Sequence, residues 1–74
     1  MEKGWVKILT YAAAIEAEIV KQMLEENGIA VVLLNKQDSS YLFGKIELYV
    51  NEQDETFANV LINGNTDTEE NNVN

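Results

Sequence analysis

The sequence contains no cysteine, histidine, proline or arginine in its 74 residues. Without cysteine there is no disulfide and no thiolate chemistry, and without cysteine and histidine the usual zinc sites and imidazole acid/base catalysis are excluded. Because proline is absent, the breaks between elements must fall at Gly, Asn, Asp or Ser. The side chains left for chemistry are carboxylates, hydroxyls and five lysines.

Positive charge is also scarce, because the five lysines stand against thirteen acidic residues and give a formal net charge of −8. Nucleic-acid affinity rests on lysine and arginine contacts with phosphates, so we expect no nucleic-acid partner. No apolar run approaches the ~20 residues that cross a bilayer. The segment Met1–Trp5 lacks the pattern of a signal peptide. We expect a cytoplasmic protein that binds no membrane.

A chain of this length forms one domain, and it buries only about 60% of the surface that its unfolded form exposes. The last eleven residues, 64–74, contain a single apolar residue, Val73. Such a segment cannot offset the entropy lost on ordering it. The sequence therefore predicts a single domain over residues 1–63 and a disordered acidic tail over residues 64–74.

Three short segments have the pattern of β-strands. Residues 5–10 are rich in aromatic and branched side chains and alternate, residues 30–35 form a short apolar run, and residues 45–50 alternate strictly. Loop 36–44 separates the second and third segments, which we expect to form a hairpin. In the third segment the alternation directs three residues into the core: Ile46, Leu48 and Val50.

Helical spacing replaces alternation over residues 13–27. The apolar residues at this spacing are expected to face the core: Ile15, Ile19, Val20, Met23 and Leu24. Thr10 has the chemistry of an N-cap. At the other end, Asn27 closes the last turn, and Gly28 takes the left-handed conformation that often ends a helix, with the apolar Ile29 after it.

A second helix is predicted over residues 52–62. Asn51 and Asp54 have the spacing of a capping box, and acidic residues load the first turn, where the helix dipole favours negative charge. The residues expected to face the core are Phe57, Ala58 and Leu61, with Val60 and Ile62 as further candidates.

The order strand, helix, strand, strand, helix is most of the ferredoxin-like βαββαβ unit, so the expected fold class is α+β with a split βαβ motif. Right-handed crossover predicts a three-stranded antiparallel sheet in spatial order 2-3-1 with two helices on one face. The fourth strand that usually lies beside strand one is missing. Strand one is then an open edge, which proteins cover, charge or use for pairing.

The helix-free face of this sheet is expected to be apolar, and loop 36–44 carries bulky residues where polar ones are usual. Apolar patches of this kind mark interfaces. The residues predicted to bind a partner are Trp5, Leu9 and Tyr49 on the sheet and Tyr41, Leu42 and Phe43 in the loop. The expected partner is a protein of unknown identity or a second copy of the chain in a homodimer. The alternative is that the loop folds back over the sheet and its bulky residues complete the core.

No group of residues has the pattern of a catalytic or cofactor site. Ser39 and Ser40 have no base to activate them, and the acids of residues 52–55 fit helix N-terminal chemistry and do not match a calcium loop. The lysines do not cluster in sequence, and no glycine-rich phosphate loop is present. We expect no enzymatic activity, no catalytic residues, no metal and no cofactor.

Two blocks carry a resemblance to a known family. Leu24–Ile29 leads into a strand, and the block Gly44-x-Ile46-x-Leu48-Tyr49-Val50 leads into an acidic helix start. In order and spacing these blocks resemble the putative prokaryotic signal-transducing proteins, small domains of unknown function. The resemblance covers residues 3–63.

The resemblance implies a PII-like, ferredoxin-type fold and a role in signal transduction, and it supplies no catalytic residues. In PII-type proteins the connection between strands two and three is a long loop that contacts effectors. Here the corresponding loop, residues 36–44, is short and lacks the basic residues expected for binding nucleotide phosphates. We therefore expect a non-enzymatic binding or regulatory module that acts through the open sheet face and this loop. The alternative is a small-ligand sensor of PII-like type for a nucleotide or metabolite.

Overall fold

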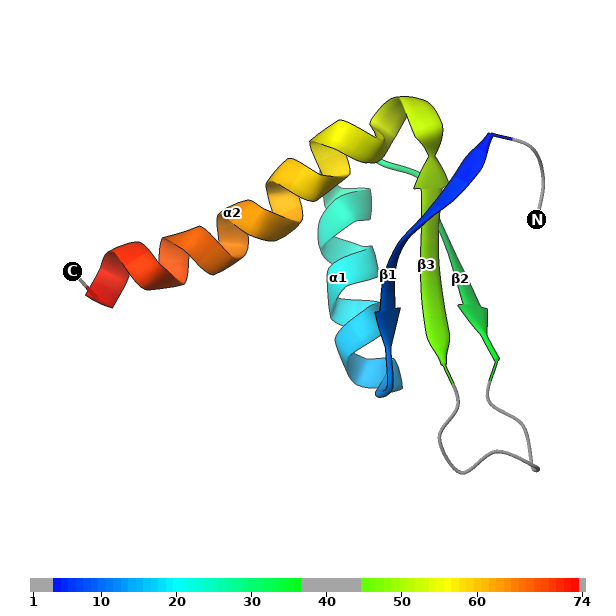
Figure 1. The fold of residues 1–74 in the computed structure, drawn as a ribbon, viewed down its shortest axis with the longest axis horizontal. Helices are drawn as coiled ribbons and strands as arrows, with labels where there is room; N and C mark the ends of the chain where they lie inside the picture. The colour runs from blue at the N-terminus through cyan, green and yellow to red at the C-terminus, as the bar shows by residue number, and fades with distance from the viewer. Residues whose placement is uncertain (1–3, 37–44, 74) are drawn as a thin grey trace.

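The computed structural model describes residues 4–36 and 45–73. Its elements, in chain order, are β1 (Trp5–Tyr11), α1 (Ala14–Glu26), β2 (Val31–Asn35), β3 (Ile46–Asn51), the 3₁₀ helix η1 (Glu52–Asp54) and α2 (Glu55–Val73). β3 is the central strand and pairs antiparallel with β1 and with β2 (Figure 1). This arrangement confirms the predicted α+β ferredoxin-like fold and the spatial order of its strands.

Both helices pack against the same face of the sheet. Leu24 of α1 and Ala58 of α2 are buried in one cluster with Val50 of β3, and a second cluster joins α1 to Ile46 and Leu48. The three β3 residues that alternation directs into the core are fully buried. The opposite face of β3 is therefore the face that carries no helix.

Four apolar residues that the sequence assigns to the core are exposed. They are Ile15 (69% exposed) and Ile19 (61%) on α1, and Phe57 (47%) and Val60 (59%) on α2. Each helix buries one narrow stripe, through Ala17 and Leu24 on α1 and through Ala58 on α2. With about 3.6 residues per turn, Ile15 and Ile19 lie on the side of α1 opposite that stripe. The prediction was wrong there because the helix has more apolar residues than one stripe can bury.

The end of α1 follows the predicted pattern closely. Asn27 is the C-cap, and Gly28 has a φ of 83°, in the left-handed region. The N–H of Gly28 donates to the carbonyl of Glu25 at 3.0 Å, and the N–H of Ile29 donates to the carbonyl of Leu24 at 3.1 Å. These two bonds form a Schellman motif, and Leu24 and Ile29 share a buried cluster, as the motif usually requires. The motif turns the chain from α1 into β2.

Substitution of Gly28 tests this turn. A Cβ at Gly28 would meet no atom within 4 Å, so the cost of Gly28→Ala arises from the backbone conformation alone. We expect Gly28→Ala to lower the free energy of unfolding by about 1 kcal/mol, and Gly28→Asn to lower it less, because Asn tolerates the left-handed region. Urea unfolding would measure both.

The matched control is Gly64→Ala, because Gly64 lies within α2 and a Cβ added there would likewise meet no atom within 4 Å. In a helix interior, alanine is favoured over glycine by up to about 1 kcal/mol, so this variant should be neutral or more stable. Equal losses at the two glycines would contradict the assigned turn.

A β-bulge changes the alternation of β1. Lys7 pairs with Tyr49, but the next residue of β3, Leu48, pairs with Leu9, so Ile8 is an extra residue in the strand. After the bulge Tyr11 pairs with Ile46 and packs against the core. Strict alternation instead predicts that Leu9 and Tyr11 point away from the core, on the same side as Lys7. Leu9 is therefore in register with a core residue and not with the outward-facing residues of the sheet.

The helix boundaries differ from the predicted ones. Thr10 lies within β1, and the N-cap of α1 is Ala13. Asn51 makes no side-chain capping hydrogen bond, so the predicted capping box is not formed, and the turn η1 precedes α2. The burial of Ile46, Leu48 and Val50 keeps β3 extended up to Asn51, which explains why the helix starts later than its acidic residues indicate.

The end predicted for the second helix, near Ile62, is also wrong, because the helical backbone of α2 continues to Val73. No proline interrupts this segment, so each of its residues keeps the backbone N–H that a helix uses. The last turns of α2 point away from the sheet (Figure 1). The division into a domain of residues 1–63 and a disordered tail of residues 64–74 stays a prediction.

Candidate functional site

The helix-free face of the sheet is built by residues that alternate with the core residues of β3. Tyr49 pairs with Lys7 on one side and with Val32 on the other, and Glu47 pairs with Leu34 of β2. Paired residues in neighbouring strands point to the same face of a sheet. These side chains therefore form one mixed surface of apolar and charged groups, which we call the outer face.

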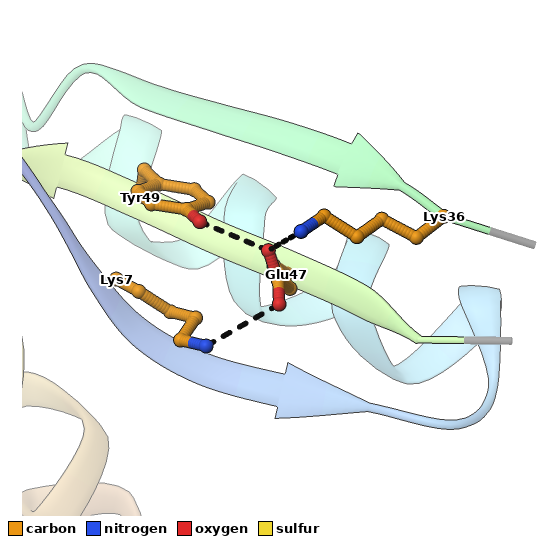
Figure 2. A network of polar contacts seen from close by, with 4 residues as sticks. All are labelled: Lys7, Lys36, Glu47 and Tyr49. Carbon is orange, nitrogen blue, oxygen red and sulfur yellow. Dashed lines mark hydrogen bonds and ion pairs between the residues drawn. The ribbon is translucent and has the colours of Figure 1, made fainter. Parts of the chain in front are cut away.

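Four residues on the outer face form a polar network around one carboxylate, which we call the Glu47 cluster (Figure 2). The hydroxyl of Tyr49 donates to Oε1 of Glu47 at 2.9 Å. The ammonium of Lys36 lies 3.2 Å from the same oxygen, and the ammonium of Lys7 donates to Oε2 at 3.3 Å. Figure 2 shows the two lysines reaching Glu47 from opposite sides, with α1 behind the sheet.

Glu47 is buried although it lies on the face without helices. Its side chain is 5% exposed, whereas those of Lys7 and Lys36 are 50% and 56% exposed. The hydrogen bond from Tyr49 lowers the pKa of the Glu47 carboxyl, burial opposes this effect, and the two lysines lower the pKa further. The net result is a pKa below the usual value for glutamate, so Glu47 is a carboxylate at neutral pH.

The structure places the predicted partner-binding residues in three different situations. Trp5 and Tyr49 are both partly buried, and the alternation of β1 puts Trp5 on the same side as Lys7. Leu9 is displaced from this face by the bulge. Tyr41, Leu42 and Phe43 lie outside the residues that the structure describes. The outer face thus brings together two of the six predicted residues.

The sequence does not show the Glu47 cluster, although alternation along the strands predicts that Lys7 and Glu47 both point to the helix-free face. Lys7 and Glu47 are 40 residues apart, and Lys36 joins them only through the pairing of β2 with β3. One signal is present in the sequence: Glu47 is an acidic residue between the apolar Ile46 and Leu48, at a position that faces away from the helices. A charge there needs partners from neighbouring strands.

The cluster has the chemistry of a fixed binding surface. An ammonium group has three N–H donors, so Lys7 and Lys36 can each donate to Glu47 and still donate to another acceptor. Glu47 already has three partners, two on Oε1 and one on Oε2. Among the side chains that the structure describes, in residues 4–36 and 45–64, no three acidic groups lie close enough together to hold a metal ion. In the same part of the chain, none of the helices has the length and apolar character to cross a membrane.

Comparison with known proteins gives one match. Residues 5–65 match the model of a family described as "putative prokaryotic signal transducing protein", which is the family that the sequence resembles. The match spans all three strands, α1 and the first half of α2. No curated protein and no solved structure matches the chain.

Proposed function

The chain belongs to the family of putative prokaryotic signal-transducing proteins, and we propose that it is a non-enzymatic binding module that recognises a protein partner through its outer face and the adjoining loop 36–44. The observation that carries this proposal is the Glu47 cluster, which includes the partly exposed Tyr49 and shares the outer face with the partly exposed Trp5. Interfaces are enriched in aromatic residues and combine an apolar centre with a polar surround.

The cluster also supports a non-enzymatic role. A carboxylate whose pKa is lowered is a weak base and holds no proton to donate near neutral pH. Ionic contacts and a hydrogen bond fix its position. Such a group orders neighbouring side chains on a surface, and this order reduces the entropy cost of binding a partner.

Self-association is the second part of the proposal. β1 lies at the edge of the sheet and can pair with a further strand. An antiparallel pairing of two β1 strands about a twofold axis between Ile8 and Leu9 would set Lys7 of one copy opposite Thr10 of the other. Because of the bulge, these two residues share a face, and no like charges would meet. A second copy of the chain is therefore one partner that the open edge fits.

The test compares two aromatic substitutions on different sides of the molecule. Trp5→Ala removes an outer-face side chain, whereas Phe57→Ala removes one that is 47% exposed on α2. With tagged protein as bait, we expect Trp5→Ala to capture at most about one tenth of the partner that the unsubstituted chain captures, in keeping with an aromatic interface residue that contributes over 1 kcal/mol. We expect Phe57→Ala to capture the partner as the unsubstituted chain does. A differently tagged copy of the chain serves as a second prey.

Circular dichroism and thermal melting establish that both variants fold. Loss of capture by Phe57→Ala with retention by Trp5→Ala would move the interface to the helical side and contradict the proposal. Absence of any captured protein, together with a rise in melting temperature on adding nucleotides or 2-oxo acids, would favour a small-ligand sensor of PII-like type.

A further inference from the structure

Charge is divided between the two sides of the domain. Lys7 and Lys36 lie on the outer face, and the position of Lys45 continues the outward alternation of Glu47 and Tyr49. With Glu47 as the acidic residue among them, the described charged residues of this face sum to a formal charge of +2. The acids of the helices belong to α1, η1 and the start of α2: Glu16, Glu18, Glu25, Glu26, Glu52, Asp54 and Glu55. Lys21, the remaining lysine with a described position, lies on α1 and pairs with Glu25 at 3.0 Å.

Lys36 and Lys45 are neighbours across the hairpin, because the N–H of Lys36 donates to the carbonyl of Lys45 at 2.8 Å. Like charges in directly opposed positions destabilise a sheet. Among the residues that the structure describes, the carboxylate of this face is that of Glu47, and two ammonium groups already share it. The folded domain thus holds an excess of positive charge on this face, although the chain as a whole carries −8.

We infer that the partner of the outer face is an acidic polypeptide segment, whose carboxylates meet Lys7, Lys36 and Lys45 and whose apolar side chains pack on Trp5, Val32 and Leu34. This inference rests on the proposed function and names the chemistry of its partner. Val32 and Leu34 are partly buried and lie in register with Tyr49 and Glu47. The apolar groups of β2 therefore lie beside basic groups on β1 and at the hairpin end, so a segment with both apolar and acidic side chains can meet both.

A polypeptide suits this face better than a nucleic acid. Nucleic-acid binding needs several phosphate contacts, and three lysines without arginine supply few of them. The acids on the helical side repel a long polyanion, but ordinary salt screens them beyond about 8 Å, so a short segment on the outer face meets mainly the local positive charge. Complementary charge at such an interface speeds association and selects the partner.

Trp5 provides a direct readout, because it is the only tryptophan of the chain and lies on the outer face. The probe is a synthetic peptide in which glutamate alternates with leucine, and the control peptide has glutamine in place of glutamate. We expect the acidic peptide to change the fluorescence of Trp5 and to shift the amide NMR signals of Lys7, Lys36 and Lys45. The affinity of the chain for this peptide should fall as the salt concentration is raised. The glutamine peptide should bind at least about fivefold more weakly.

The decisive variants each reverse the charge of one lysine, Lys45 on the outer face or Lys21 on α1. Lys45 makes none of the contacts of the Glu47 cluster, and we expect Lys45→Glu to weaken peptide binding about fivefold or more. Lys21→Glu makes the same charge change on α1 and should alter binding less than about twofold. Three results would overturn the inference. They are an equal loss of peptide affinity in both variants, equal affinity for the glutamine and the glutamate peptide, and tighter binding of a DNA duplex than of the acidic peptide.

Failure of this inference is distinguishable from failure of the proposed function. If Lys45→Glu still captures the partner while Trp5→Ala does not, the outer face binds a protein whose recognition does not depend on acidic groups. If Trp5→Ala captures the partner as well as the unsubstituted chain does, the proposed function itself fails.

Discussion

Leu48→Ala is expected to lower the free energy of unfolding by about 2–5 kcal/mol, the usual range when a buried leucine is truncated to alanine. Leu48 is fully buried at the centre of the middle strand, in a cluster with Ala17 and Ile46. A chain of 74 residues has a total stability of about 4–11 kcal/mol, so this single change removes a large part of it. Urea unfolding followed by circular dichroism would measure the loss, and a variant already unfolded without urea would agree with the upper end.

Ile19→Ala is the matched control for this change. Helical periodicity assigns Ile19 to the core, whereas the structure leaves it 61% exposed on the far side of α1. The structure therefore predicts a change in stability within about 0.5 kcal/mol, as for other surface positions. A loss above about 2 kcal/mol at Ile19, or a loss below about 1 kcal/mol at Leu48, would show that the helix and sheet pack through other faces.

The predictions from the sequence succeeded where one residue pattern fixes one local structure. Ile46, Leu48 and Val50 alternate along β3, so the face that meets the helices follows directly. Gly28 ends α1 because few other residues adopt its backbone angle. The element order then limited the topology to a ferredoxin-like arrangement, and the strand order followed from the handedness of the crossover.

The failures have a common cause, which is that they depend on contacts between distant segments. The sequence around Ile8 does not predict a bulge, because it contains no glycine. The bulge arises from the register in which β1 pairs with β3. That fit moves Leu9 away from the outward register. On α1, periodicity shows that apolar residues recur, but only packing against the sheet selects Leu24 over Ile15.

The Glu47 cluster is the strongest example, because three strands must be in register before its members meet. Trp5 and Tyr49 were predicted from their size and position alone. The lysines were set aside because they are scattered along the sequence, whereas the fold brings Lys7 and Lys36 to the same carboxylate. The sequence pattern therefore predicts the aromatic residues of the candidate site and misses its ionic residues, and the binding role of both stays a prediction.

Glu47→Gln is expected to lower the melting temperature at pH 7 more than the removal of any exposed acidic residue. In the folded chain the carboxylate accepts a hydrogen bond from Tyr49 and ionic contacts from Lys7 and Lys36. The amide that replaces it has no charge, so both ammonium groups lose their ionic partner and repel each other across the strand. Thermal melting by circular dichroism would measure the drop, with Glu18→Gln, an exposed acid of α1, as the charge-matched control.

The dependence of this loss on pH separates a charge effect from a packing effect. The pKa of Glu47 is lowered by folding, so its contribution to stability is present above the unfolded value of about 4.5 and is lost as pH falls through the lower folded value. The difference in melting temperature between the unsubstituted chain and Glu47→Gln should therefore shrink as pH falls from 6 towards 3. A difference that stays constant over this range would mean that Glu47 acts through its shape, and the outer face would then lack the ionic order on which its proposed binding function depends.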